Sequence, residues 1–239
     1  MKREYHRWYS PALQRDMELL LFGYAGARVL AFPTSAGRFF DWENRGLIAA
    51  IADQIENGWI QVCCVDSVDR ESWYAYAKHP AQRVERHAQY DRYLHDEVLP
   101  LLTQGTHDPY VIVTGPSFGG YHAVNFGLRH PLRVNRILSM SGLCDIRMFT
   151  DGWYGDSLYF HNPVDFVAGE FDEHRLDQYR RLDIILAVGH DDRLRPSNEQ
   201  MSQVLHSKRI YHRLRVWNGF AHDWPEWQRM LQLYLGGQN

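Results

Sequence analysis

The chain has 239 residues, of which 45% are hydrophobic, and it carries a formal net charge of −3 at pH 7. A chain of this size can bury a sizeable core, and we expect one domain over residues 1–239. The slightly acidic balance gives no reason to expect nucleic acid or an anionic membrane surface as a partner. No apolar run reaches the length of a membrane span, and the first residues do not resemble a signal peptide.

The cysteine content bears on the compartment. Cys63, Cys64 and Cys144 form an odd set, and neighbouring cysteines on one apolar strand rarely bridge each other. A disulfide framework is therefore not expected. Free buried thiols are typical of a reducing environment, and we expect a cytoplasmic protein.

Short apolar segments alternate with helical ones along the chain. Residues 18–24 and 28–32 flank a glycine-containing turn and predict a β-hairpin. Apolar residues on one helical face predict a helix over about 42–57. The later predicted elements are strand 60–65, helix 83–102, strand 110–114, helix 121–129, strands 134–140 and 182–188, helix 197–205, strand 214–217 and a helix from about 225. This alternation predicts an α/β fold with a mainly parallel central sheet, helices on both faces and an opening antiparallel hairpin.

One stretch departs from the alternation. Residues 142–181 are rich in Asp, Gly and aromatic residues and are too long for a simple βα loop. We expect an insertion or cap segment here, over the sheet edge where an active site would lie. Aromatic residues in this stretch and in an earlier loop are candidates for a substrate pocket, although core packing would use them equally well. The candidates are Trp73, Trp153, Tyr154, Tyr159 and Phe160.

The hexapeptide Gly115–Gly120 carries the strongest functional signal. It reads Gly-Pro-Ser-Phe-Gly-Gly and lies between an apolar strand and a helical segment, which is the context of a G-x-S-x-G nucleophile turn. Glycines flank such a turn because side chains there would clash with the strand or the helix. Ser117 is therefore a candidate nucleophile. The alternative is a serine that only caps the helix.

A serine nucleophile needs a base, and the base needs an orienting carboxylate. In this arrangement the serine comes first in the chain, then the acid, then the histidine. Asp192 follows the predicted strand 182–188 and is the favoured acid, with the adjacent Asp191 as the open alternative. His222 lies between the last predicted strand and the last helix, where the base belongs. Ser117, Asp192 and His222 are thus the candidate catalytic residues.

The oxyanion of the reaction needs two N–H donors. The backbone of Phe118, which follows the nucleophile, is one candidate. The second donor is expected in the loop after the strand that ends at Phe32, where small residues allow close approach of a substrate. Ser35 is the candidate in that loop, and the alternative is a plain connecting loop.

These motifs resemble the putative-esterase branch of the α/β-hydrolases, which includes S-formylglutathione hydrolase (esterase D), feruloyl esterases and mycolyltransferases. The segments that carry the resemblance are Ser10–Leu13, Phe32–Ser35 with Trp42, Gly115–Gly120, Arg195–Asn198 and Ala221–Trp227. The resemblance implies an α/β-hydrolase fold and a serine esterase or acyltransferase with Ser117, Asp192 and His222 as its triad. The loop after Phe32 differs from the longer oxyanion loop of the S-formylglutathione enzymes. Residues 66–74 match no functional motif of the family.

The expected activity is hydrolysis of small to medium acyl esters through an acyl-enzyme on Ser117, with no cofactor and no metal. The histidines show no metal-ligand spacing, and no dinucleotide-binding or P-loop motif occurs. One alternative is acyl transfer to another alcohol by the same triad, and a second is a non-catalytic binding module on this fold. The expected partner is a small-molecule ester. Aromatic residues on the surface are compatible with a homodimer, although no feature requires one.

Overall fold

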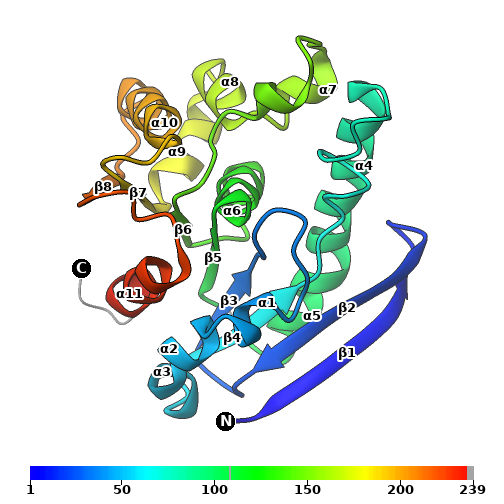
Figure 1. The fold of residues 1–239 in the computed structure, drawn as a ribbon, viewed down its shortest axis with the longest axis vertical. Helices are drawn as coiled ribbons and strands as arrows, with labels where there is room; N and C mark the ends of the chain where they lie inside the picture. The colour runs from blue at the N-terminus through cyan, green and yellow to red at the C-terminus, as the bar shows by residue number, and fades with distance from the viewer. Residues whose placement is uncertain (108, 236–239) are drawn as a thin grey trace.

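The computed structural model describes residues 1–107 and 109–235 and is built on one eight-stranded sheet (Figure 1). The strand order is β1-β2-β4-β3-β5-β6-β7-β8. The strands are β1 (Arg3–Ser10), β2 (Arg15–Phe22), β3 (Ala27–Ala31), β4 (Ile60–Val65), β5 (Val111–Pro116), β6 (Arg136–Met140), β7 (Asp183–Gly189) and β8 (Arg213–Trp217). β2 is antiparallel to both β1 and β4, and all other neighbours are parallel. This sheet confirms the predicted fold class.

The opening hairpin consists of β1 and β2, so the predicted pairing of residues 18–24 with 28–32 is wrong. β4 pairs with both β2 and β3 and therefore separates them. β1 alternates between exposed and less exposed side chains, which suits an edge strand, whereas β3 and β4 are almost entirely buried and need neighbours on both sides. A turn signal in the sequence indicates a change of direction, but it does not determine which strands become neighbours.

Helices cover both faces of the sheet. One face packs against α1 (Asp41–Asn44), α2 (Leu47–Ala50), α3 (Ala52–Glu56) and α11 (Trp224–Leu235). The other face packs against α4 (Pro80–Tyr93), α5 (Leu99–Thr103), α6 (Phe118–Arg129), α8 (Pro163–Ala168), α9 (Glu173–Arg180) and α10 (Arg195–Ser207). Alternate residues of β7 serve the two cores, with Ile184 on one side and Ile185 on the other.

Two predicted helices are divided in the structure. The helix predicted over 42–57 consists of α1, α2 and α3, and the chain breaks at Gly46, which has a φ of +76°. The helix predicted over 83–102 begins at Pro80 and passes through one π-helical turn, η1 (Leu94–Val98), into α5. Pro100 has no N–H to donate to the preceding turn, and a wider turn before it accommodates the missing hydrogen bond.

The predicted site residues follow the carboxyl ends of parallel strands. β5 leads into α6 through Ser117, Asp192 comes shortly after β7, and His222 follows β8. Residues 141–182 connect the neighbouring strands β6 and β7 and contain η2 (Ile146–Phe149), α7 (Asp156–Tyr159), α8 and α9. Figure 1 shows α7 and α8 at one end of the molecule, beyond α6.

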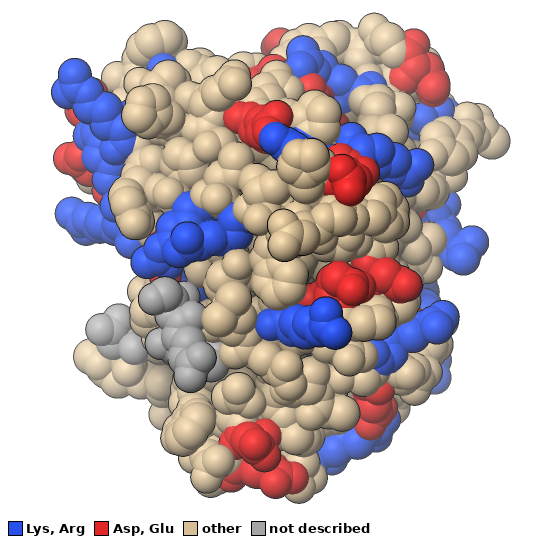
Figure 2. Space-filling model, turned by 60° about the vertical axis from the view of Figure 1, so that its left-hand side comes forward, with Lys and Arg blue, Asp and Glu red and all other residues tan. Residues whose placement is uncertain are grey.

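The surface carries charges of both signs. Figure 2 shows basic and acidic side chains interspersed on the face that it draws. Among residues 1–107 and 109–235, none of the helices combines the length and the apolar character needed to span a bilayer. The same residues contain no group of three or more His, Cys, Asp or Glu side chains placed to hold a metal ion.

Candidate active site

Ser117 lies on a strained turn between β5 and α6. Its φ and ψ are +56° and −122°, a conformation that costs a non-glycine residue on the order of 1–3 kcal/mol. Neighbouring backbone groups impose it. The Ser117 N–H donates to the Met140 carbonyl of β6 at 2.8 Å, and the Gly120 N–H donates to the Ser117 carbonyl at 2.9 Å. The turn thereby presents the Ser117 hydroxyl at the carboxyl edge of the sheet.

Two glycines of the motif are required by close backbone contacts. A Cβ atom on Gly115 would lie 2.6 Å from the Gly119 carbonyl carbon. A Cβ atom on Gly119 would lie 2.5 Å from the Pro33 carbonyl oxygen. Both neighbours are backbone atoms, which cannot rotate away as the end of a side chain can. The glycines therefore allow the start of α6 to pack directly against β5 and against the loop after β3.

Three side chains from three separate loops form one hydrogen-bonded series. His222 Nδ1 lies 2.8 Å from Asp192 Oδ2, and His222 Nε2 lies 3.1 Å from Ser117 Oγ. The Asp192 side chain is fully buried, and its Oδ1 accepts a hydrogen bond from the Leu194 N–H at 2.9 Å. With both oxygens engaged, the carboxylate has a fixed orientation. The order of contacts is the one that a serine nucleophile, its base and an orienting acid require.

The serine that follows β6 supports the histidine loop. Ser141 Oγ donates to the Ala221 carbonyl at 2.9 Å, next to His222, and accepts from Trp227 Nε1 at 3.2 Å. The Trp227 ring also packs on the His222 imidazole, with the ring centroids 5.2 Å apart. These contacts hold the imidazole from one side while Asp192 holds its Nδ1. Sequence reasoning missed Ser141, because no local pattern links it to a loop about eighty positions later.

The adjacent aspartate occupies a different environment. The Asp191 side chain is 64% exposed, and its Oδ1 lies 2.7 Å from His190 Nδ1. Its backbone N–H donates to the Gly219 carbonyl at 2.9 Å. Of the two candidate acids, Asp192 is the one that the structure places against His222.

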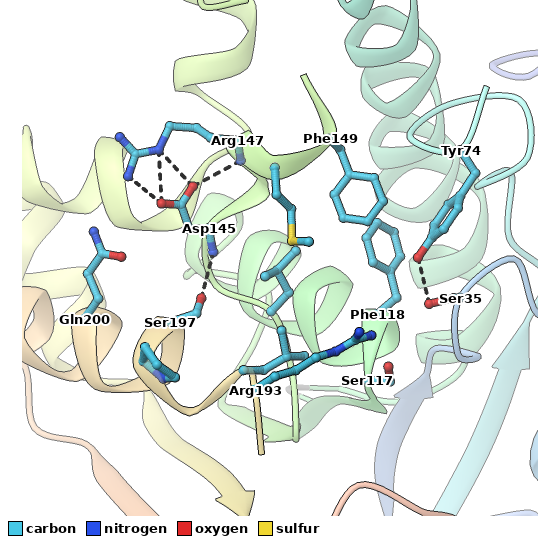
Figure 3. Close-up of a pocket in the computed structure, with 14 residues that line it drawn as sticks. Ser35, Tyr74, Ser117, Phe118, Asp145, Arg147, Phe149, Arg193, Ser197 and Gln200 are labelled. Atoms are coloured by element: carbon cyan, nitrogen blue, oxygen red, sulfur yellow. Dashed lines mark hydrogen bonds and ion pairs between the residues drawn. The ribbon is translucent and has the colours of Figure 1, made fainter. Parts of the chain in front are cut away.

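Both candidate oxyanion donors lie close to the nucleophile. Phe118 and Ser35 line the same pocket as Ser117, and Figure 3 shows the three gathered at one end of it. Phe118 is the first residue of α6, so its N–H has no acceptor within the helix. Ser35 lies in the loop after β3, and its Oγ accepts a hydrogen bond from the Tyr74 hydroxyl at 2.7 Å.

The pocket beside Ser117 has a volume of about 450 Å³. Its remaining wall residues come from three segments: Tyr74; Leu143, Asp145, Arg147, Met148 and Phe149; and Arg193, Leu194, Pro196, Ser197 and Gln200. Burial alone would raise the pKa of Asp145, but hydrogen bonds from Arg147 lower it, so these two residues form an ion pair. One side of the pocket is therefore aromatic and aliphatic, and the opposite side is polar (Figure 3).

The structure places Tyr74 rather than Trp73 in the pocket wall. Trp73 is fully buried behind it, with its ring edge-on to Tyr121 at 5.9 Å between centroids. Tyr74 packs edge-on against Phe118 at 5.2 Å. Neighbouring residues in this loop point to different sides, so the presence of aromatic residues in the sequence could not tell which one reaches the pocket.

The aromatic residues predicted from the insertion also lie away from this pocket. Trp153 packs edge-on against His79, and the Tyr154 hydroxyl donates to Asp165 Oδ2 at 2.8 Å. Tyr159 borders a separate pocket of about 320 Å³. The segment 142–181 instead contributes its first turn, including η2, to the wall beside Ser117. That turn follows β6 directly, which keeps it at the carboxyl edge of the sheet.

The cysteine thiols are buried and unreactive. Burial raises the pKa of Cys144 to about 12 and raises the pKa of Cys63 and Cys64 well above the ordinary thiol value. The thiols therefore remain protonated at neutral pH, and a thiol is a much weaker nucleophile than a thiolate. The three cysteines are free in the structure.

The fold is that of the α/β-hydrolases, and the candidate site lies at the carboxyl edge of its sheet. The sequence matches the family described as "Putative esterase" over residues 36–235, and the chain belongs to that family. It is an enzyme of the carboxylesterase type, as the resemblance implied. A search of curated proteins finds no significant match.

Three solved structures illustrate the likeness in fold. A ferulic acid esterase is 17% identical with a TM-score of 0.77, over 98% of this chain and 96% of that one. An S-formylglutathione hydrolase from Agrobacterium tumefaciens is 14% identical with a TM-score of 0.76, over 98% and 93% of the two chains. MPT51 of Mycobacterium tuberculosis is 16% identical with a TM-score of 0.72, over 99% and 97%. At these identities the likeness is one of fold.

Proposed function

We propose that this protein is a serine carboxylesterase that hydrolyses small to medium acyl esters through an acyl-enzyme on Ser117. The observation that carries the proposal is the hydrogen-bonded series from Asp192 through His222 to Ser117, which ends in a pocket. Membership of an esterase family supports ester substrates. The arrangement needs no cofactor, since Ser117 and His222 provide the nucleophile and the base, and two backbone N–H groups provide the oxyanion donors.

In the first half-reaction, Ser117 Oγ bonds to the ester carbonyl carbon as its proton passes to His222 Nε2. Asp192 stabilises the imidazolium through Nδ1 and keeps the ring in one tautomer. The carbonyl oxygen becomes an oxyanion, which the Phe118 N–H and a second N–H at Ser35 stabilise. The carbonyl then re-forms as the carbon–oxygen bond to the leaving group breaks, and His222 gives its proton to the leaving oxygen, so that an alcohol departs.

In the second half-reaction, His222 removes a proton from water as the water oxygen bonds to the acyl carbon. The same donors stabilise the second oxyanion. The bond from the acyl carbon to Ser117 Oγ breaks, His222 returns the proton to Oγ, and the carboxylic acid leaves. Acyl transfer would differ only in that an alcohol takes the place of water.

The pocket limits the groups that fit beside the nucleophile. A volume of about 450 Å³ lies at the lower end for small-molecule sites, which favours short and medium chains. Tyr74, Phe118 and Phe149 suit an apolar acyl or alcohol group. We propose that residues 142–181 act as a cap segment whose first turn determines which esters are accepted.

Labelling with a fluorophosphonate, in parallel with turnover of p-nitrophenyl acetate and butyrate, tests the proposal. We expect one adduct that maps to Ser117 and a matching loss of turnover. Ser117→Ala should abolish both the adduct and turnover, whereas Ser157→Ala, at an exposed serine, should preserve them. A folded wild-type protein with neither an adduct nor turnover would refute the proposal. Product analysis with added alcohols separates hydrolysis from acyl transfer.

A further inference from the structure

The segment 66–74, which follows β4, contacts the loop after β3 residue by residue. Four consecutive loop residues, 35–38, each form a hydrogen bond to this segment, and the partners run in the reverse order along the chain. The bonds are Tyr74 O–H to Ser35 Oγ (2.7 Å), Ala36 N–H to Asp69 Oδ2 (3.0 Å), Ser67 O–H to the Gly37 carbonyl (2.8 Å) and Arg38 Nε–H to Asp66 Oδ1 (2.8 Å). The conformation of this loop is therefore set by the segment beside it.

Asp69 also joins this loop to the nucleophile helix. Its Oδ1 lies 2.9 Å from Nε2 of His122, and each of the two side chains is 1% exposed. His122 lies in α6, the helix that begins at Phe118. A buried carboxylate is costly unless each oxygen has a hydrogen-bond donor, and here the donors are the Ala36 N–H and His122. One carboxylate thus links the two backbone segments that carry the oxyanion donors.

The loop has a conformation that requires such a constraint. Ala36 has a φ of +52°, which is uncommon for a residue with a Cβ atom. Strained backbone of this kind persists only where the surrounding structure imposes it. The hydrogen bond from the Ala36 N–H to Asp69 acts on the strained residue itself.

Tyr74 provides the second attachment. Burial raises the pKa of Tyr74 to about 12, so its hydroxyl stays protonated and can donate to Ser35. Its ring packs edge-on against Phe118 at 5.2 Å and against Phe149 at 5.0 Å. Tyr74 therefore contacts both residues proposed as oxyanion donors and the wall of the pocket.

We propose that the segment 66–74 holds the second half of the oxyanion hole in place, with Asp69 and Tyr74 as positioning residues. The inference rests on the proposed esterase function. An N–H donor stabilises the transition state only when it is already aimed at the position where charge develops. A displacement of about 1 Å can cost on the order of 100-fold in rate, so loss of these contacts lowers kcat without removing the binding pocket.

Two variants test this role. Asn at position 69 keeps the shape of the aspartate side chain but has one oxygen instead of two. It therefore cannot accept a hydrogen bond from both the Ala36 N–H and His122. We expect Asp69→Asn to lower kcat about 10- to 100-fold and Tyr74→Phe about 3- to 10-fold, with KM changed less than about threefold. The control is Tyr76→Phe, at an exposed tyrosine two positions away, with kcat unchanged.

Binding of a trifluoromethyl ketone distinguishes a displaced oxyanion donor from a general loss of structure in the variants. Ser117 Oγ bonds to the ketone carbonyl carbon as its proton passes to His222, and the carbonyl π electrons move to oxygen, so that the resulting oxyanion occupies the hole. We expect both variants to bind this analogue more weakly by about the factor lost in kcat, with unchanged melting temperature for Tyr74→Phe. If Asp69→Asn does not fold, Tyr74→Phe carries the test alone.

The outcomes are distinct. Wild-type kcat and wild-type affinity for the ketone in the variants, together with normal labelling of Ser117, would overturn the positioning role and leave the esterase proposal intact. A loss confined to KM would also overturn it. Absence of both labelling and turnover in the wild-type protein would refute the esterase proposal itself.

A second inference concerns the charge of the pocket. Asp145 and Arg147 neutralise each other, whereas Arg193 has no hydrogen bond or ion pair among the described residues. In Figure 3 the Arg193 side chain extends across the pocket toward Phe118 and Ser117. The pocket beside the nucleophile thus carries one uncompensated positive charge.

We infer that the favoured ester carries a carboxylate within reach of Arg193, an inference that again rests on the esterase function. A guanidinium binds a carboxylate through two parallel N–H donors, which gives both affinity and orientation. An acyl group that ends in a carboxylate, such as succinyl, would present that carboxylate to Arg193 while its ester carbon meets Ser117.

Paired substrates of equal length test this inference. We expect Arg193→Gln to lower kcat/KM for the p-nitrophenyl ester of succinic acid about tenfold more than for p-nitrophenyl butyrate, consistent with loss of one charged contact. Arg195→Gln is the control, because Arg195 pairs with Glu199 at 2.8 Å outside the pocket. An equal loss on both substrates, or no loss on either, would overturn the inference while the butyrate activity still reports on the esterase.

Discussion

At the scale of single residues, two neighbouring aspartates provide a sharp test of the proposed triad. Asp192→Asn removes the charge that stabilises the imidazolium and disturbs the tautomer of His222, so we expect kcat to fall on the order of 10³- to 10⁴-fold. Asp191→Asn changes an exposed side chain paired with His190 and should leave kcat within about threefold. Turnover of p-nitrophenyl acetate, with circular dichroism as the control for folding, measures both.

A reversed order of the two losses would transfer the acid role to Asp191. Equal losses would point to a disturbance of the loop after β7, since the two residues share its backbone. The expected contrast depends on burial: Asp192 lies inside the protein with both oxygens engaged, whereas Asp191 is mostly in water.

At the scale of elements, two of the three glycines in helix α6, Gly119 and Gly127, differ in what surrounds them. A Cβ atom on Gly119 would lie 2.5 Å from the Pro33 carbonyl oxygen, so it pushes on the backbone of the loop after β3. A Cβ atom on Gly127 would lie 2.5 Å from side-chain atoms of Ile137, which can shift. We expect Gly119→Ala to lower kcat on the order of 100-fold, because the oxyanion donors move apart.

Gly127→Ala is the matched comparison within the same helix. Overpacking against Ile137 costs about 1–3 kcal/mol, and the higher helix propensity of alanine offsets about 1 kcal/mol of this. We expect a lower melting temperature with kcat within about twofold of the wild type. If Gly119→Ala retained full turnover, the packing of α6 on the loop would be irrelevant to catalysis.

At the scale of the whole molecule, buried histidines predict acid sensitivity. Burial lowers the pKa of His161 to about 3 and that of His87 well below its ordinary value, with nearby positive charge adding to the effect. Below about pH 6.5 the unfolded chain binds protons at these residues and the folded protein does not, so stability falls as pH falls. Each histidine contributes up to about 1.4 kcal/mol per pH unit.

Asp66 acts in the opposite direction. Burial raises the pKa of Asp66 to about 6. Below that pH the folded state binds a proton at Asp66 that the unfolded state does not bind, until the pH reaches the ordinary pKa of an aspartate. This proton offsets the loss of stability caused by about one of the two histidines. Urea unfolding between pH 7 and 5 should still show a net loss of stability. His161→Gln should reduce the slope of the unfolding free energy against pH, below pH 6.5, by the equivalent of about one bound proton. A stability that is constant over this range would contradict the prediction.

Local patterns in the sequence were enough to indicate the nucleophile turn and the order of the site residues. G-x-S-x-G is visible in sequence because its glycines lie at fixed positions around Ser117, although only Gly115 avoids a clash within the motif and Gly119 avoids one with Pro33. Strand and helix segments were likewise indicated by short-range periodicity. The order of the strands was not indicated by local patterns. β4 lies between β2 and β3, and the burial of its side chains, rather than any turn sequence, determines this position.

The pocket was decided by tertiary structure alone. Tyr74 comes from the segment after β4 and Phe149 from the segment after β6, yet their rings meet at 5.0 Å in one wall. Ser141 contacts the histidine loop 80 positions later, and Asp69 contacts both α6 and the loop after β3, at separations of 53 and 33 positions. Such contacts depend on how whole elements dock against one sheet, and docking is set by the summed packing of many side chains rather than by any local pattern.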